Sequence, residues 1–196
     1  MNDMFALTGS IAIGGLFLLS VMRFYGGLVE HAQEKTYELM AQESTASLME
    51  IIESDFRKMG SGLPVSLPPI VANPDSSDIT FWADLNEDGA PELVRYYTSL
   101  PSDTDAAATQ NPNDFILYRV VDGVNTVDTP AGVVGFSVRL LDELAAVPAD
   151  LSEVRMLDVS LTVESLYAYD EKYPRVVWNK RIVPQNLVKI SDTDFD

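Results

Sequence analysis

The chain has 196 residues, which is enough for one domain of ordinary size. It has no cysteine and one histidine, His31, which excludes disulfides, zinc–thiolate sites, cysteine nucleophiles and multi-histidine metal sites. Thirteen Lys and Arg against 30 Asp and Glu give a net charge of −17, which repels nucleic-acid phosphates, so we expect no nucleic-acid partner.

The first feature along the chain is a run of nineteen residues without a charge, between Asp3 and Arg23. As a helix this run is about 28 Å long, close to the ~30 Å hydrocarbon core of a lipid bilayer. We therefore predict a single transmembrane helix over residues 1–25. The residues expected to meet lipid or another helix are Asp3, Phe5, Leu7, Ile11, Ile13, Leu16, Phe17 and Leu18.

Two other interpretations of this run stay open. A cleaved secretory signal peptide is typically preceded by basic residues, and residues 1–3 carry none. A buried core helix is compatible with the small and polar residues Thr8, Gly9 and Ser10. Arg23 is the only nearby basic residue, so charge determines the orientation in a membrane only weakly.

A second, amphipathic helix is expected over residues 26–62. Apolar residues recur at steps of three and four, which predicts one buried stripe that packs on a sheet. The stripe consists of Ala41, Thr45 (through its methyl group), Leu48, Ile52, Phe56 and Met59. Glycines at 60 and 62 and Pro64 end the helix. The two segments can form one helix of more than fifty residues, with Gly26 and Gly27 as its weakest point.

The rest of the chain is predicted to be an antiparallel β-sheet domain over residues 63–190, followed by a frayed tail over 191–196. Residues 65–78 are rich in Pro, Ser, Asn and Asp and are expected to form a connector, and 99–113 a loop. Short β-branched runs with period-two alternation predict strands at 79–83, 93–97, 115–121, 133–141, 156–163 and 176–183. Asp122-Gly123 is typical of a tight hairpin turn. The expected fold class is therefore α+β, with the long N-terminal helix packed on the sheet.

One loop has a pattern typical of a cation site. Asp84, Asn86, Asp88 and Glu92 offer side-chain oxygens, and Ala90 could add its carbonyl, around a glycine that permits a sharp turn. The pattern resembles the calcium loops between strands in propeller and adhesin repeats. It is not an EF-hand, because Arg95 stands at loop position twelve. The alternative is an acidic turn without a metal, since Asn, Asp and Gly are ordinary turn residues.

Enzymatic activity is not expected. Glycines 9, 14 and 15 lie in the apolar run, so they do not form a phosphate-binding loop after a strand. Carboxylate pairs are numerous by chance in so acidic a chain. Serines and lysines occur without a motif typical of a catalytic triad.

The order of these parts resembles a type IV pilin or pseudopilin. The likeness is carried by Ile52–Gly62, Ile79–Tyr96, Phe115–Gly123 and Val133–Arg139, and is greatest for the larger minor pilin-like subunits of type IV pilus and type II secretion systems. It implies an apolar helix that anchors the subunit in the bacterial inner membrane and then packs in a filament core. The expected partners are other pilin-like subunits or membrane proteins, with the C-terminal domain periplasmic or extracellular.

The sequence departs from this family at its N-terminus. Family members are made with a basic leader that is cut after a glycine, and they carry Glu at the fifth mature position. Here Asp3 is the only acid before Arg23, and it could replace that Glu or be a polar flank. The alternative function is a calcium-stabilised binding or adhesion module, or an accessory subunit of another membrane complex.

Overall fold

The computed structural model describes residues 2–64, 67–99, 110–128, 132–168 and 171–187. One long helix packs against two antiparallel sheets, which confirms the predicted α+β fold. Most of the expected loop at 99–113 and the expected frayed tail lie outside the described residues, as do the side chains of Asp3 and Phe5.

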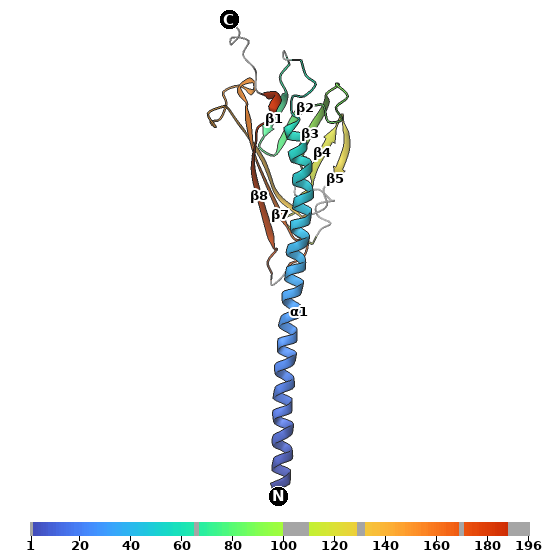
Figure 1. Cartoon of the computed structure of the whole chain (residues 1–196), viewed down its shortest axis with the longest axis vertical. Helices are drawn as coiled ribbons and strands as arrows, with labels where there is room; N and C mark the ends of the chain where they lie inside the picture. Colours follow the sequence, from blue (N-terminus) through green and yellow to red (C-terminus); the bar gives the residue numbers. More distant parts are fainter. Residues whose placement is uncertain (1, 65–66, 100–109, 129–131, 169–170, 188–196) are drawn as a thin grey trace.

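Helix α1 runs without interruption from Asn2 to Arg57. Its 56 residues make a rod about 84 Å long, and it continues through Gly26 and Gly27. Figure 1 shows its N-terminal half projecting from the sheet domain, with the N-terminus at the far end. Gly60, three residues past the end of the helix, has a φ of 81°, the left-handed conformation in which the chain often turns away from a helix. Met59, just past the last helical turn, bridges to Ala83.

The strands form two separate sheets. The five-stranded sheet has the order β1-β2-β3-β4-β5 and the three-stranded sheet the order β6-β7-β8. The bounds are β1 Ile70–Asp75, β2 Asp78–Ala83, β3 Glu92–Thr98, β4 Leu117–Val121, β5 Val124–Asp128, β6 Val133–Leu141, β7 Met156–Glu164 and β8 Arg175–Ile182. Two short 3-10 helices, Leu151–Glu153 and Gln185–Leu187, follow β6 and β8.

The prediction of a connector over residues 65–78 was wrong, because it contains β1. This strand lies at the edge of its sheet and pairs only with β2, with irregular register between Ile70↔Phe81 and Asp75↔Asp78. An edge strand tolerates a proline, here Pro74, because one of its sides needs no ladder hydrogen bonds. The expected turn at Asp122-Gly123 does join β4 to β5, with φ of 49° and 78° as a type I′ turn requires.

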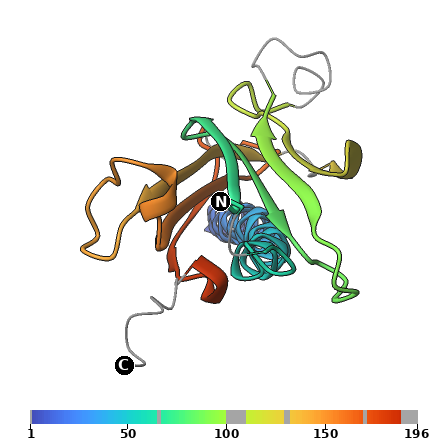
Figure 2. The same ribbon diagram turned by 90° about the horizontal axis from the view of Figure 1, so that it is seen from above.

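The core lies where the C-terminal part of α1 meets the inner faces of both sheets. Seen along the helix, the strands lie around one side of it (Figure 2). Phe56 packs edge-on against Phe81 at 5.2 Å and against Tyr96 at 5.4 Å between ring centroids. The helix therefore supplies part of the core of the domain that it carries.

Candidate functional site

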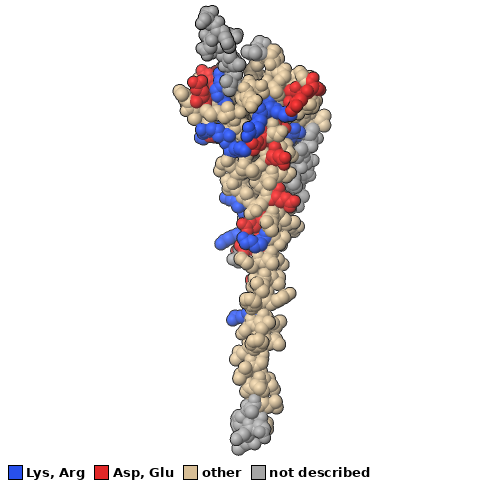
Figure 3. All heavy atoms as spheres, in the orientation of Figure 1, with Lys and Arg blue, Asp and Glu red and all other residues tan. Residues whose placement is uncertain are grey.

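The N-terminal half of α1 is the candidate membrane segment. It contains an 18-residue window with a mean hydropathy of 1.6, of which no part is buried, so by length and composition it could cross a membrane. All side chains from Leu7 to Met22 are exposed, which does not support the interpretation as a buried core helix. In Figure 3 charged residues gather on the sheet domain, and this half of the helix is almost free of them.

The apolar residues cover this segment on all sides. Leu16, Phe17 and Leu18 are 66%, 71% and 60% exposed, and consecutive residues point in different directions around a helix. Of the other residues predicted to meet lipid or a helix, Leu7, Ile11 and Ile13 are 61%, 65% and 71% exposed. A helix that is apolar all round needs either lipid or other helices around it.

The apolar surface continues past Arg23 on one face of the helix. Val21, Tyr25, Leu28, Ala32 and Leu39 recur at steps of three, four or seven residues, and we call them the outer stripe. Each residue turns a helix by about 100°, so the outer stripe lies roughly half a turn from the sheet-facing stripe. Leu28 and Leu39 are 53% and 63% exposed. This periodicity is typical of helix–helix packing.

The C-terminal part of α1 attaches to the sheets through the predicted stripe. The five residues expected in the helix–sheet core are all buried, and so is Thr45, whose hydroxyl donates to the carbonyl of Ala41 at 2.6 Å. Their exposed fractions are 3% for Ala41, 6% for Leu48, 1% for Ile52 and 0% for both Phe56 and Met59.

A buried polar cluster joins the helix to β3 and β4. The Arg119 guanidinium donates to both carboxylate oxygens of Asp55, from Nε at 2.6 Å and Nη2 at 3.0 Å, and the Tyr96 hydroxyl donates to Asp55 Oδ2 at 2.6 Å. Burial and the neighbouring Asp55 carboxylate raise the pKa of Tyr96 well above its ordinary value. Sequence reasoning missed this cluster, although Asp55 lies within about 40° of the apolar stripe and is therefore a charge on the buried face.

Further polar contacts hold the end of the helix. Glu53 accepts hydrogen bonds from Lys180 on β8 and from Arg57 on its own helix, and both lower the pKa of Glu53. Lys58 donates to the carbonyl of Leu85 at 2.7 Å. The last turns of α1 are thus tied to both sheets and to the loop after β2.

That loop contains the predicted cation ligands. Asp84 accepts hydrogen bonds from the backbone N–H groups of Asp88 and Gly89, and Asp88 accepts one from Ala90. Asn86 Oδ1 accepts from the Asp88 N–H, and Glu92 accepts from the Leu85 N–H. The side-chain oxygens are therefore directed at the backbone of their own loop.

Within the described residues, no group of three or more His, Cys, Asp or Glu side chains is arranged to hold a metal ion. Calcium binding stays a prediction. Its test is thermal unfolding with calcium and with a chelator, using Asp88→Asn as the control variant. A calcium-dependent rise in Tm that Asp88→Asn abolishes would support a calcium site.

The candidate functional element is thus helix α1. Its N-terminal half is exposed and apolar, and its C-terminal part lies in the core of the sheet domain. Comparisons with protein-family models, curated proteins and solved structures found no match to this chain. The functional argument therefore depends on the geometry of α1 and its sheets.

Proposed function

We propose that the chain is a non-catalytic, membrane-anchored, pilin-like subunit of a type IV pilus or type II secretion-like assembly. It is held in the bacterial inner membrane by residues 1–25, with the sheet domain on the periplasmic or extracellular side. One observation carries the proposal: α1 is a single helix whose exposed half is apolar on all sides and whose other half completes the domain core.

The continuity of α1 supports a structural role. A flexible tether would be enough to keep a domain near a membrane, whereas this rod holds the domain at a fixed distance and rotation. The Asp55–Tyr96–Arg119 cluster fixes that rotation, because bidentate Arg–carboxylate pairs need one geometry. Fixed geometry is what a repeating assembly needs from each subunit.

The outer stripe supports helix–helix contact in addition to lipid contact. Leu28, Ala32 and Leu39 lie beyond Arg23, where a single-pass anchor alone would leave them in water. A neighbouring helix would cover them. We propose that this helix belongs to another copy of the chain.

Two buried carboxylates support the non-catalytic part of the proposal. Asp55 is engaged by Arg119 and Tyr96, and Glu164 by Arg175 and Asn111. Both groups join separate elements of the fold and thus have a structural role.

The experiment uses the full chain expressed in a bacterium, and its lack of cysteine allows single cysteines to be placed freely. We expect the protein to resist carbonate extraction from membranes and Leu28→Cys to cross-link to a second copy. Gln33→Cys, exposed on another face of the helix, is the matched control. Soluble protein whose first thirty residues are open to protease would contradict the anchor. Cross-links only to unrelated membrane proteins would contradict self-assembly and favour the accessory role.

A further inference from the structure

The loop between β6 and β7, residues 142–155, displays the two most exposed large hydrophobic side chains of the described chain. Leu144 is 83% exposed and Val147 is 77% exposed, more than any described residue of the apolar half of α1. The loop lies at the end of the molecule opposite the N-terminus (Figure 1). Lipid around the N-terminal helix would not reach it. Leu144 and Val147 both belong to an unbroken apolar run, residues 144–149, that is exposed or half-buried throughout, and contiguous exposed apolar surface commonly marks a protein contact.

Hydrogen bonds hold this loop in one conformation. The Asp142 carboxylate accepts from the N–H groups of Leu144 and Ala146, both at 2.8 Å, and Glu153 accepts from Ala149 at 3.0 Å. Ala145 has a φ of 60°, a strained conformation for alanine that surrounding contacts must maintain. Leu144 is thus presented in a fixed position, which reduces the entropy lost when a partner binds.

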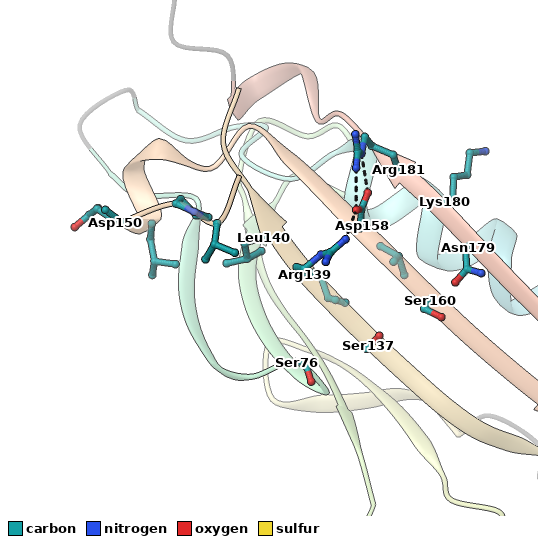
Figure 4. A pocket seen from close by; sticks show the side chains of 16 residues that line it. Ser76, Ser137, Arg139, Leu140, Asp150, Asp158, Ser160, Asn179, Lys180 and Arg181 are labelled. Atoms are coloured by element: carbon teal, nitrogen blue, oxygen red, sulfur yellow. Dashed lines mark hydrogen bonds and ion pairs between the residues drawn. The ribbon is translucent and has the colours of Figure 1, made fainter. Parts of the chain in front are cut away.

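A groove of about 1080 Å³ lies beside the loop, on the outer face of β6, β7 and β8. Its floor carries Ser137, Ser160 and Asn179, and Arg139 and Arg181 lie at one side, both bonded to Asp158 (Figure 4). The apolar wall consists of loop residues Val147, Pro148, Ala149 and Leu151.

The loop is acidic, whereas the triad of Arg139, Asp158 and Arg181 in the groove has a net positive charge. The charged residues of the loop are Asp142, Glu143, Asp150, Glu153 and Arg155, which give it a net charge of −3. In the groove, Asp158 is shared by Arg139 and Arg181, which leaves one positive charge uncompensated within this triad. The side chains of the two arginines are 67% and 48% exposed, so an incoming carboxylate can reach them.

From this complementarity we propose that the β6–β7 loop of one copy docks in the groove of a neighbouring copy. Leu144 enters the groove against the apolar wall, and Glu143 pairs with Arg139 or Arg181. The contact joins different surfaces on the two copies, so it can repeat without closing. The proposal rests on the proposed function, since the neighbouring copy must lie alongside.

The test uses two differently tagged full-length versions of the chain in the same membrane. One carries Leu144→Cys and the other Ser160→Cys, and a short bismaleimide joins cysteines that come close together. We expect the doubly tagged cross-linked dimer to form in clear excess over a control pair in which Thr80→Cys replaces Ser160→Cys. Thr80 is half-buried like Ser160 but lies on β2 of the other sheet.

Glu143→Lys in the Leu144→Cys version should lower the yield of this dimer by about tenfold, because it places like charges together. Leu28→Cys in a separate sample reports helix assembly. If Leu28→Cys cross-links but the loop–groove pair gives no more dimer than the Thr80 control, the docking proposal is overturned and the proposed function stands. A loop–groove dimer without a Leu28 cross-link supports docking and overturns the helix assembly. Absence of both products overturns both.

Discussion

The two halves of α1 lie in opposite environments. In the N-terminal half Phe17 is 71% exposed, whereas in the C-terminal part Phe56 is 0% exposed. The difference lies in the pattern: residues 4–22 are apolar around the whole helix, and residues 41–59 along one stripe. The same helix therefore has a first half suited by its composition to lipid or to other helices, and a second part that lies in a protein core.

The strongest test of this difference between the halves of α1 is to truncate one phenylalanine in each half. Phe56→Ala leaves a cavity between α1, β2 and β3 and should lower the free energy of unfolding of the sheet domain by about 3–5 kcal/mol. Phe17→Ala should leave that free energy unchanged, because Phe17 has no contact with the domain. Urea unfolding in detergent, followed by tryptophan fluorescence, measures both. Equal effects of the two substitutions would contradict the division of the helix.

The second test removes a charge from the buried stripe. Asp55→Ala leaves the Arg119 guanidinium buried without its partner and should cost about 3 kcal/mol or more of domain stability. Arg57→Ala, on the same turn but in an exposed pair with Glu53, should cost only about 0.5 kcal/mol. The same urea titration compares them. A loss with Asp55→Ala no larger than that with Arg57→Ala would show that the cluster does not fix the helix.

The third test addresses the exposed half. Leu16→Arg places a charge in the middle of the apolar segment and should disfavour membrane insertion by about 2.5–3.5 kcal/mol. Leu39→Arg, at a similarly exposed position beyond the segment, should leave insertion unchanged. Carbonate extraction of membranes gives the bound fraction of each. Unchanged binding of Leu16→Arg would mean that the segment does not enter the hydrocarbon core.

The smallest effect is expected on the sheet surface. Hydrogen bonds from Arg181 and then Arg139 lower the pKa of Asp158 from 3.8 to about 2. Because the pKa is lower in the folded state, this group stabilises the fold above about pH 4, and the contribution is lost as the pH falls toward 2. Asp158→Asn should cost about 1 kcal/mol or less at pH 7 and nothing near pH 2, as Tm measurements at the two values would show. An equal loss of stability at pH 7 and near pH 2 would show that Asp158 contributes through packing and not through its charge.

The sequence predicted the parts of the molecule that depend on periodicity. Every member of the stripe from Ala41 to Met59 is buried, because helical spacing determines which residues share a face. Edge strand β1 was missed because its proline and asparagine are typical of loops. Composition also gave no sign that the strands divide into two sheets, since pairing depends on contacts between distant segments.

The buried cluster shows a different limit. Asp55 could be recognised as a charge on an apolar face, but its partners Tyr96 and Arg119 are 41 and 64 residues away in sequence. No local pattern connects them. The groove beside the β6–β7 loop was missed for the same reason, since Ser137, Ser160 and Asn179 come together only when β6, β7 and β8 pair.

The unbroken passage of α1 into the core also has a mechanical consequence. Tension applied along the helix axis reaches the domain with no hinge between, and it loads the stripe contacts and the Asp55 cluster in shear, all at once. Peeling a helix away from one end would break the same contacts one after another, at lower force. The domain should therefore resist axial pulling far better than sideways pulling at the N-terminus.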